Sequence, residues 1–282
     1  KETPNPKRHG CWYHAVRGLI NGNAVLLVTL LVTLFVLAVQ SERWILAGVL
    51  LALATVKPHL ILLPAIFTLI WAGSRDRWSL VGAFLISTTL LIGGSMLLIP
   101  DWILQNLREI IRFPEYNTVL TLGELLGNWL PGIRRQIQYA PTIILGFVLI
   151  VEWIAARNSS FRRFFWTFAL TLVISQWVGI PTDPGNFILL FPALVIILSA
   201  WDKRWNKTNR WAGGAVLGLL WVGLWYIFLS TVVITYQPIQ SPIMFIPLPA
   251  FLLLGLYWVK WWYAAPIQRI VMQPDGNLSV DG

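Results

Sequence analysis

The chain has 282 residues, of which 57% are hydrophobic and only 12% are charged. Soluble domains carry roughly 25% charged residues, so this composition excludes an ordinary soluble fold. The net charge of +9 comes from basic residues scattered over short links, which excludes the continuous basic stripe of a nucleic-acid-binding protein. One cysteine, Cys11, and three widely spaced histidines exclude an intramolecular disulfide and a recognisable metal motif.

Long apolar runs indicate an all-α, polytopic transmembrane helical bundle. A bilayer core of about 30 Å needs about 20 apolar residues per helix, and a helix satisfies its own backbone hydrogen bonds in lipid. We predict about nine helices. They cover 23–40, 44–72 as two short helices, 78–99, 141–156, 164–178, 186–200, 211–234 and 243–262.

The run 44–72 is interrupted by Lys57, Pro58 and His59. The whole run is much longer than a bilayer is thick, and Pro58 disfavours helical geometry at Lys57. We therefore predict two short helices that meet at Lys57-Pro58 near one membrane face. A single kinked span is the alternative, and it would reverse the sidedness of everything before it.

Basic residues recur on every second connection, which the positive-inside rule assigns to the cytoplasm. They are Arg75, Arg77, Arg157, Arg162, Arg163, Lys203, Arg204, Lys207 and Arg210. Loops 100–140, 179–186 and 235–242 then face outward. We expect a multi-pass protein of the cell membrane with an outward N-terminal segment (1–22), a transmembrane domain (23–262) and a cytoplasmic C-terminal tail (263–282).

The outward loop 100–140 begins with an amphipathic stretch. Trp102, Ile103 and Leu107 share one helical face, and Arg108 and Arg112 lie on the other. This pattern predicts a juxtamembrane helix in the interface. Its arginines suit a lipid phosphate, and a solvated helix face is the alternative for each of them.

Two further stretches carry candidate site residues. Lys57 and His59 lie beside a helix break, where a lysine could meet a phosphate or extend to the headgroups. Asp183 and Asn186 lie at an outward break, where they could face a cavity or form an ordinary turn. Glu152, near the inner end of its span, is explained by snorkelling or by a helix contact.

Several segments resemble a known family. Gly22-Asn23 opens a span, the stretch from Arg43 through Ala47-Gly48 to Lys57-Pro58 follows, and then comes Arg75-Asp76-Arg77-Trp78. This order resembles the GT-C-type membrane glycosyltransferases. Their closest branch here is the polyprenyl-phosphate-mannose-dependent mannosyltransferase group, glycosyltransferase family 87. The stretch Pro181 to Pro192 resembles the outward motif of that family.

The resemblance implies an enzyme that takes a sugar, here mannose, from a polyprenyl-phosphate carrier on the outer face. Lys57 matches the phosphate-side lysine of the family, Asn23 a polar residue that opens the same span, and Asn186 a position that often holds Asp or His. The donor is a substrate, and we expect no cofactor and no metal. Membrane lipids and the polyprenyl-linked sugar are the expected partners.

The catalytic aspartate of the family follows its first span, and no such loop precedes Gly22. We expect that loop to lie upstream of Lys1, with Asp183 as a substitute base if it does not. Two other hypotheses stay open. One is a transporter of lipids or solutes, because discontinuous helices are also a transporter signature. The other is a non-catalytic subunit of a larger membrane complex.

Overall fold

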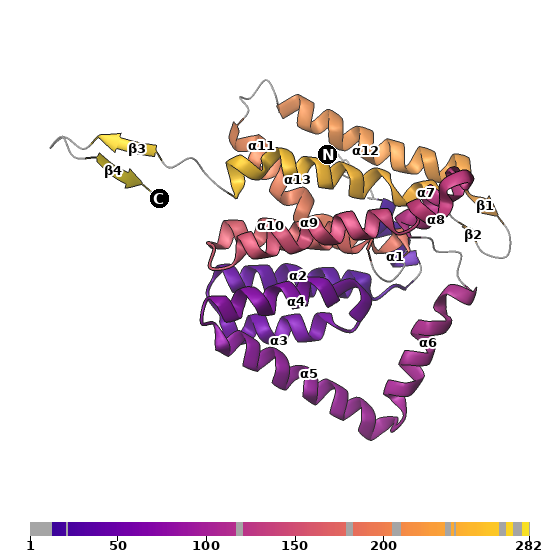
Figure 1. Cartoon of the computed structure of the whole chain (residues 1–282), viewed down its shortest axis with the longest axis horizontal. Helices are drawn as coiled ribbons and strands as arrows, with labels where there is room; N and C mark the ends of the chain where they lie inside the picture. Colours follow the sequence, from indigo (N-terminus) through magenta and orange to yellow (C-terminus); the bar gives the residue numbers. More distant parts are fainter. Residues whose placement is uncertain are drawn as a thin grey trace, which may run out of the picture.

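The computed structural model describes residues 13–20, 22–116, 121–178, 183–204, 210–234, 238–239, 241–264, 269–272 and 278–281. In this part the chain is a helical bundle, so the predicted all-α fold is confirmed (Figure 1). The described strands form two short antiparallel hairpins, β1 (Val233–Ile234) with β2 (Pro238–Ile239), and β3 (Arg269–Met272) with β4 (Leu278–Asp281).

Each predicted span corresponds to a helix. These helices are α2 (Val25–Gln40), α3 (Trp44–Ala54), α4 (Pro58–Ser74), α5 (Trp78–Leu98), α9 (Ala140–Ala156), α10 (Phe161–Ser175), α11 (Phe191–Arg204), α12 (Arg210–Thr231) and α13 (Pro247–Tyr263). The span predicted at 186–200 begins with a 3-10 turn, η2 (Pro184–Leu190), and a shorter one, η4 (Pro242–Phe245), precedes α13. Five of the described helical segments are long and apolar enough to cross a membrane.

Helix α10 lies at the centre of the bundle. Its side chains from Trp166 to Ser175 are all buried, and it packs against α4, α9, α11 and α13. In contrast, α5 and α12 lie at the periphery, and most of their apolar side chains are exposed. Exposed apolar side chains of this kind are expected where a helix faces lipid, so α5 and α12 fit lipid-facing positions.

The run 44–72 folds as two antiparallel helices, as predicted, and the kinked single span is wrong. The rings of Trp44, which begins α3, and Trp71, near the end of α4, are 6.3 Å apart. Lys57 takes the extended geometry that the following proline demands, with φ −118° and ψ 80°. Pro58 is the first residue of α4, where a missing N–H costs nothing.

Helices α2, α3 and α4 are short. They have 16, 11 and 17 residues, and at about 1.5 Å per residue they measure roughly 24, 16 and 25 Å. Each is shorter than a hydrocarbon core of about 30 Å.

Gly48 brings α3 and α5 into backbone contact. A Cβ atom at this position would lie 2.4 Å from the Leu80 carbonyl oxygen and 2.8 Å from the Phe84 backbone nitrogen. Small residues allow such close approach between membrane helices. Gly48 therefore fixes the distance between these two helices.

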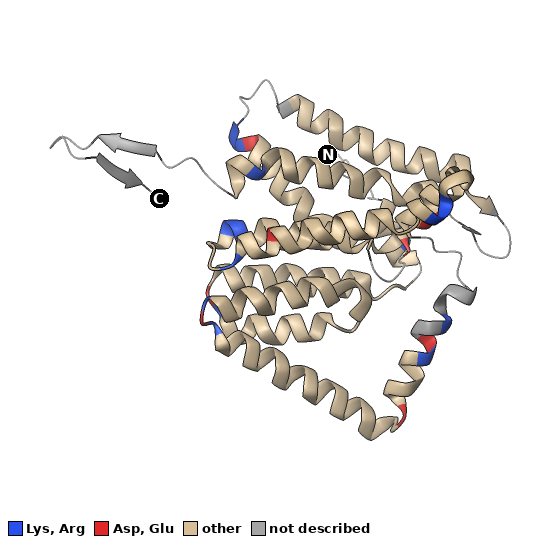
Figure 2. Ribbon diagram, viewed as in Figure 1, with Lys and Arg blue, Asp and Glu red and all other residues tan. Residues whose placement is uncertain are grey.

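Basic side chains gather at one end of the bundle, which we call the basic end (Figure 2). It is formed by Arg75, Arg77, Arg157, Arg162, Arg163, Lys203, Arg204 and Lys260. The links that carry them touch: Arg75 Nη1 donates to the Asn158 carbonyl at 3.0 Å, and the Arg204 guanidinium lies 4.2 Å from the centroid of the Trp262 ring. The basic links that the sequence shows on every second connection therefore lie together at one end of the bundle.

The region 100–140 contains more helix than predicted. The expected amphipathic helix is α6 (Trp102–Tyr116), which packs against α5 and extends away from the bundle (Figure 1). It is followed by α7 (Leu122–Trp129), the 3-10 turn η1 (Pro131–Ile133) and α8 (Arg134–Ile137). The sequence analysis did not predict α7, whose capping box pairs Thr121 with Glu124.

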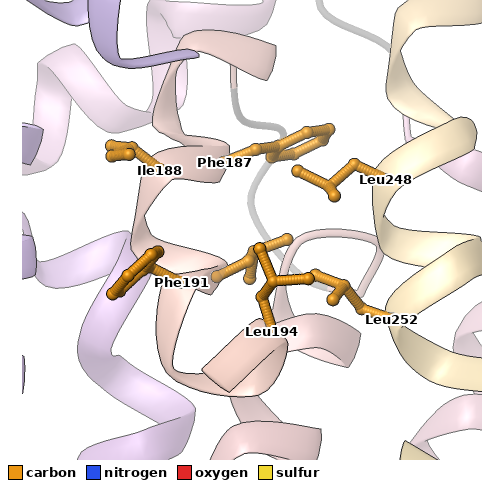
Figure 3. A pocket seen from close by; sticks show the side chains of 7 residues that line it. Phe187, Ile188, Phe191, Leu194, Leu248 and Leu252 are labelled. Carbon is orange, nitrogen blue, oxygen red and sulfur yellow. The ribbon is translucent and has the colours of Figure 1, made fainter. Parts of the chain in front are cut away.

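A small hollow between η2, α11 and α13 is a packing feature. Apolar side chains line it, among them Phe187, Leu194 and Leu252 (Figure 3). Its volume is about 10 Å³, at the lower limit for a single water molecule. It has no room for a substrate.

Candidate functional site

Three polar residues from distant parts of the chain meet at the end of the bundle opposite the basic end. Lys57 Nζ donates to Asn186 Oδ1 at 3.2 Å and also to Asn23 Oδ1. Asn23 Nδ2 donates to the same Asn186 oxygen at 3.2 Å. Asn186 is only 4% exposed. We call Asn23, Lys57 and Asn186 the polar cluster.

Helix ends position the polar cluster. Asn23 precedes α2, and its Oδ1 accepts the Val25 N–H at 3.0 Å, so it also caps that helix. Lys57 precedes α4, and Asn186 lies in η2. The cluster therefore lies where three helical segments begin, and the positive ends of the two α-helix dipoles favour anions nearby.

The charge of Lys57 is held by neutral groups. The side chain is half-buried. Among the described residues Lys57 has hydrogen bonds to two amide oxygens and no ion pair. Its charge is thus solvated by dipoles and not neutralised by a bound carboxylate.

Asp183 forms the turn that the sequence offered as one of two alternatives, and it also makes an ion pair that the sequence did not predict. Its Oδ1 accepts the Gly185 N–H at 2.6 Å and caps η2, which is the expected turn. Its Oδ2 lies 3.7 Å from Arg17 Nη2, which makes an ion pair at the same end of the bundle as Lys57. The carboxylate therefore holds the loop before η2 and binds a cation from another helix.

That cation comes from α1 (Tyr13–Ile20), which the sequence analysis did not predict. His14 on this helix is buried, and its ring centroid lies 5.5 Å from that of Phe187. Burial lowers the pKa of His14 to about 3. The buried face (Tyr13, His14, Gly18) with Arg17 beside it is an amphipathic pattern that could have indicated this helix.

The remaining candidates lie in different places. His59 is partly buried in the first turn of α4, two residues after Lys57. Arg108 and Arg112 are exposed on α6, and the structure does not bring them to the polar cluster. Within the described residues, no three His, Cys, Asp or Glu side chains form a group that could hold a metal ion.

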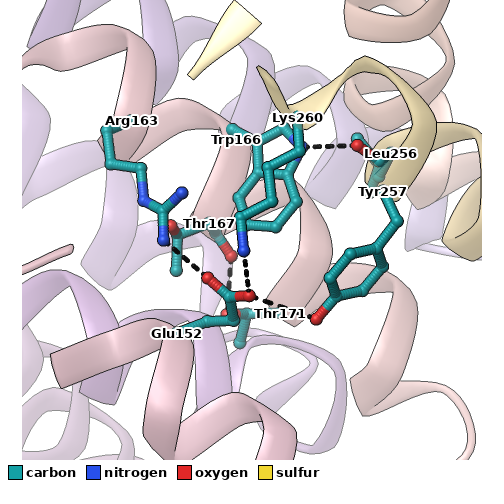
Figure 4. Close-up of polar contacts among 8 residues, drawn as sticks. All are labelled: Glu152, Arg163, Trp166, Thr167, Thr171, Leu256, Tyr257 and Lys260. Carbon is teal, nitrogen blue, oxygen red and sulfur yellow. Dashed lines mark hydrogen bonds and ion pairs between the residues drawn. The ribbon is translucent and has the colours of Figure 1, made fainter. Parts of the chain in front are cut away.

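A second polar network lies near the basic end (Figure 4). Glu152 is 5% exposed. Its carboxylate accepts from Arg163 Nη2 at 2.6 Å, from Lys260 Nζ at 2.5 Å and from the Tyr257 hydroxyl at 3.3 Å. Of the two explanations for Glu152, the helix contact is the one that the structure shows. The network joins α9, α10 and α13.

The fold and the polar cluster define a multi-pass membrane protein with a cationic group held among helix ends. The model of glycosyltransferase family 87 matches residues 12–178, more than half of the 282 residues. The chain belongs to this family, so it is a membrane glycosyltransferase. The match includes Arg17, Asn23 and Lys57, whereas Asp183 and Asn186 lie beyond it. Comparisons with curated proteins and with solved structures find no match.

Proposed function

We propose that this chain transfers a mannosyl residue from a polyprenyl-phosphate carrier to an acceptor on the outer face of the membrane. The observation that carries the proposal is that Lys57 is a half-buried cation without a carboxylate partner among the described residues. This cation is half-buried and is bound only by amide oxygens among the described residues. An intramembrane lysine without a carboxylate partner is expected to have a functional ligand, and a phosphate supplies the missing negative charge.

In this proposal Lys57 binds a phosphate oxygen of the donor. When the bond between the sugar and the phosphate oxygen breaks, negative charge increases on the departing polyprenyl phosphate. An ammonium group already in place stabilises that charge without reorganisation. Asn23 and Asn186 hold Lys57 in position through the bonds described above.

The acceptor hydroxyl has to lose a proton to a base, usually a carboxylate. Asp183 lies at the same end as Lys57, but its oxygens already bind the Gly185 N–H and Arg17. We therefore propose that Asp183 positions η2, and through η2 Asn186, and is not the base.

The outward orientation rests on the two ends of the bundle. Basic links favour the cytoplasm. The polar cluster lies at the other end of the bundle, because Asn23 and Lys57 precede the first residues of α2 and α4, whose last residues lead into the links at the basic end. We therefore propose that the polar cluster faces outward. On the same reasoning we propose that the C-terminal end of α13 lies on the cytoplasmic side, because Lys260 belongs to the basic end.

Lys57→Ala tests the proposal. The protein, reconstituted in lipid nanodiscs, receives polyprenyl-phosphate mannose with a radiolabelled sugar, and transfer is measured against membrane acceptors. A charge-assisted hydrogen bond is worth about 1.5–3 kcal/mol, so we expect transfer to fall about 10- to 150-fold. Lys203→Ala, which removes an exposed lysine at the basic end, is the matched control and keeps normal activity.

The pH profile gives a second measurement on the same residue. Activity should fall at alkaline pH, where loss of the Lys57 proton removes the charge that binds the phosphate. Lys57→Arg keeps the charge and should move this fall to higher pH. Full activity of Lys57→Ala would refute the phosphate-binding role. Movement of the labelled lipid across the membrane without sugar transfer would favour a transporter, and activity only within a complex would favour a subunit.

A further inference from the structure

A groove at the basic end has the features of a lipid site. It is lined by Glu42 and Arg43 in the link before α3, by Trp44, Ile45 and Val49 on α3, and by Ser79 on α5. Its volume is about 590 Å³, within the range of roughly 300–1,000 Å³ found for small-molecule sites. The groove is open on one side, so a ligand can enter it laterally.

The lining changes from charged to apolar along the groove. Glu42 and Arg43 form the mouth at the basic end, and the side chains of α3 continue from there. Ile45 is 66% exposed, so protein does not cover this apolar surface. A ligand that fits this lining has a charged head and a hydrocarbon tail.

One guanidinium group at the mouth is available to a ligand. The Arg43 side chain is exposed and has neither an ion pair nor a hydrogen bond among the described residues. Arg77 does not line the groove, but its guanidinium lies 4.4 Å from the centroid of the Trp44 ring and adds positive charge behind that wall. A guanidinium such as that of Arg43 binds a phosphate through two parallel hydrogen bonds.

The carboxylate of Glu42 distinguishes between headgroups. It lines the same mouth as Arg43 and has no ion pair among the described residues. A headgroup with a phosphate and a primary ammonium matches both charges at once. An anionic glycerol headgroup can donate hydroxyl hydrogen bonds to Glu42 but brings no positive charge, and a choline headgroup brings the charge but has no N–H donor.

We propose that this groove binds a phospholipid with an ethanolamine headgroup. Its phosphate contacts Arg43, its ammonium contacts Glu42, and one acyl chain follows Ile45 and Val49 along α3. This site lies at the end of the bundle opposite the polar cluster, so it is separate from the site proposed for the sugar donor and does not depend on that function.

Native mass spectrometry of the full chain in detergent tests the proposal. Phosphatidylethanolamine, phosphatidylglycerol and phosphatidylcholine with identical acyl chains are added in turn, and the bound fraction is measured. We expect phosphatidylethanolamine to bind most tightly. Loss of the arginine–phosphate bonds in Arg43→Ala should weaken it by about tenfold. Arg157→Ala, an exposed arginine at the same end, is the control and should change nothing.

Two further variants examine the head and the tail separately. Glu42→Gln is a mild change at an exposed position and should abolish the preference for ethanolamine over glycerol. Val49→Trp fills the groove and should weaken all three lipids alike. Tighter binding of phosphatidylglycerol than of phosphatidylethanolamine by the unmodified protein, or equal binding of phosphatidylethanolamine by Arg43→Ala and the unmodified protein, would overturn the proposal.

Discussion

Replacing Glu152 by Gln tests how the basic end of the bundle is held together. The substitution keeps the shape of the side chain and removes its charge. Arg163 and Lys260 donate to the two oxygens of this carboxylate at 2.6 and 2.5 Å. After the change two cations, 14% and 17% exposed, face each other without an anion between them.

Two opposing magnitudes set the expected cost. Removing one partner from a buried ion pair in a soluble protein costs about 3–5 kcal/mol, because an unpaired charge stays buried. In membranes the average hydrogen bond between helices is worth only about 0.6 kcal/mol, because the unfolded state also finds partners. Here two charges lose their partner, so the first effect prevails, and we expect a loss of about 2–3 kcal/mol. A double variant, Glu152→Gln with Lys260→Met, also removes one of the two cations. It should regain about half of the stability lost in Glu152→Gln.

The free energy of unfolding is measured by titrating the reconstituted protein from mild detergent into sodium dodecyl sulfate, with tryptophan fluorescence as the signal. Asp76→Asn is the control. It removes a carboxylate from an exposed turn at the same end, and asparagine tolerates the φ of 55° found there. A cost below about 0.5 kcal/mol for Glu152→Gln, or no recovery in the double variant, would refute the reasoning, since surface substitutions lie within that range.

Two other predictions concern α1 and the contact between α3 and α5. Because burial lowers the pKa of His14 to about 3, its contribution to stability is complete above pH 6.5 and is lost as the pH falls towards 3. At pH 5 the loss is about 2 kcal/mol. We expect to see it as lower protection factors for the amides of 13–20, with each exchange rate divided into the intrinsic rate at the same pH, and His14→Phe should abolish this fall. Unchanged protection factors at pH 5 would contradict the prediction. Gly48→Ala forces a Cβ against the Leu80 carbonyl and should cost about 1–3 kcal/mol in the same titration. The control Gly82→Ala, with open space around it, should cost little, and equal effects of the two would show that the close contact is unimportant.

Helices were the predictable part of this molecule, because a lipid environment forces an apolar run into a helix. The helix break at Lys57 was also predictable, since Pro58 disfavours helical backbone angles at the residue before it. The sequence could not decide between a hairpin and a kink. The contact between Trp44 and Trp71 decides that, and it depends on tertiary packing.

The site was predictable only in part. Lys57 and Asn186 were proposed from their places at helix breaks, and Asn23 from a resemblance. No local pattern shows that residues 34, 129 and 163 positions apart share hydrogen bonds. Arg17 was missed because its function depends on Asp183, far along the chain. Arg108 and Arg112 have the right charge, yet they lie on a helix that extends away from the bundle.

The short lengths of α2, α3 and α4 have a consequence for which molecules can reach Lys57. Measured from the basic end, these helices stop short of the full thickness of the hydrocarbon layer. A phosphate that contacts Lys57 therefore has to descend below the surrounding headgroups. A donor anchored by a long polyprenyl tail can be drawn to that depth, whereas a water-soluble sugar nucleotide has no anchor to hold it there. Under the proposed function, helix length would therefore select a lipid-anchored donor by depth, before any side chain recognises the sugar.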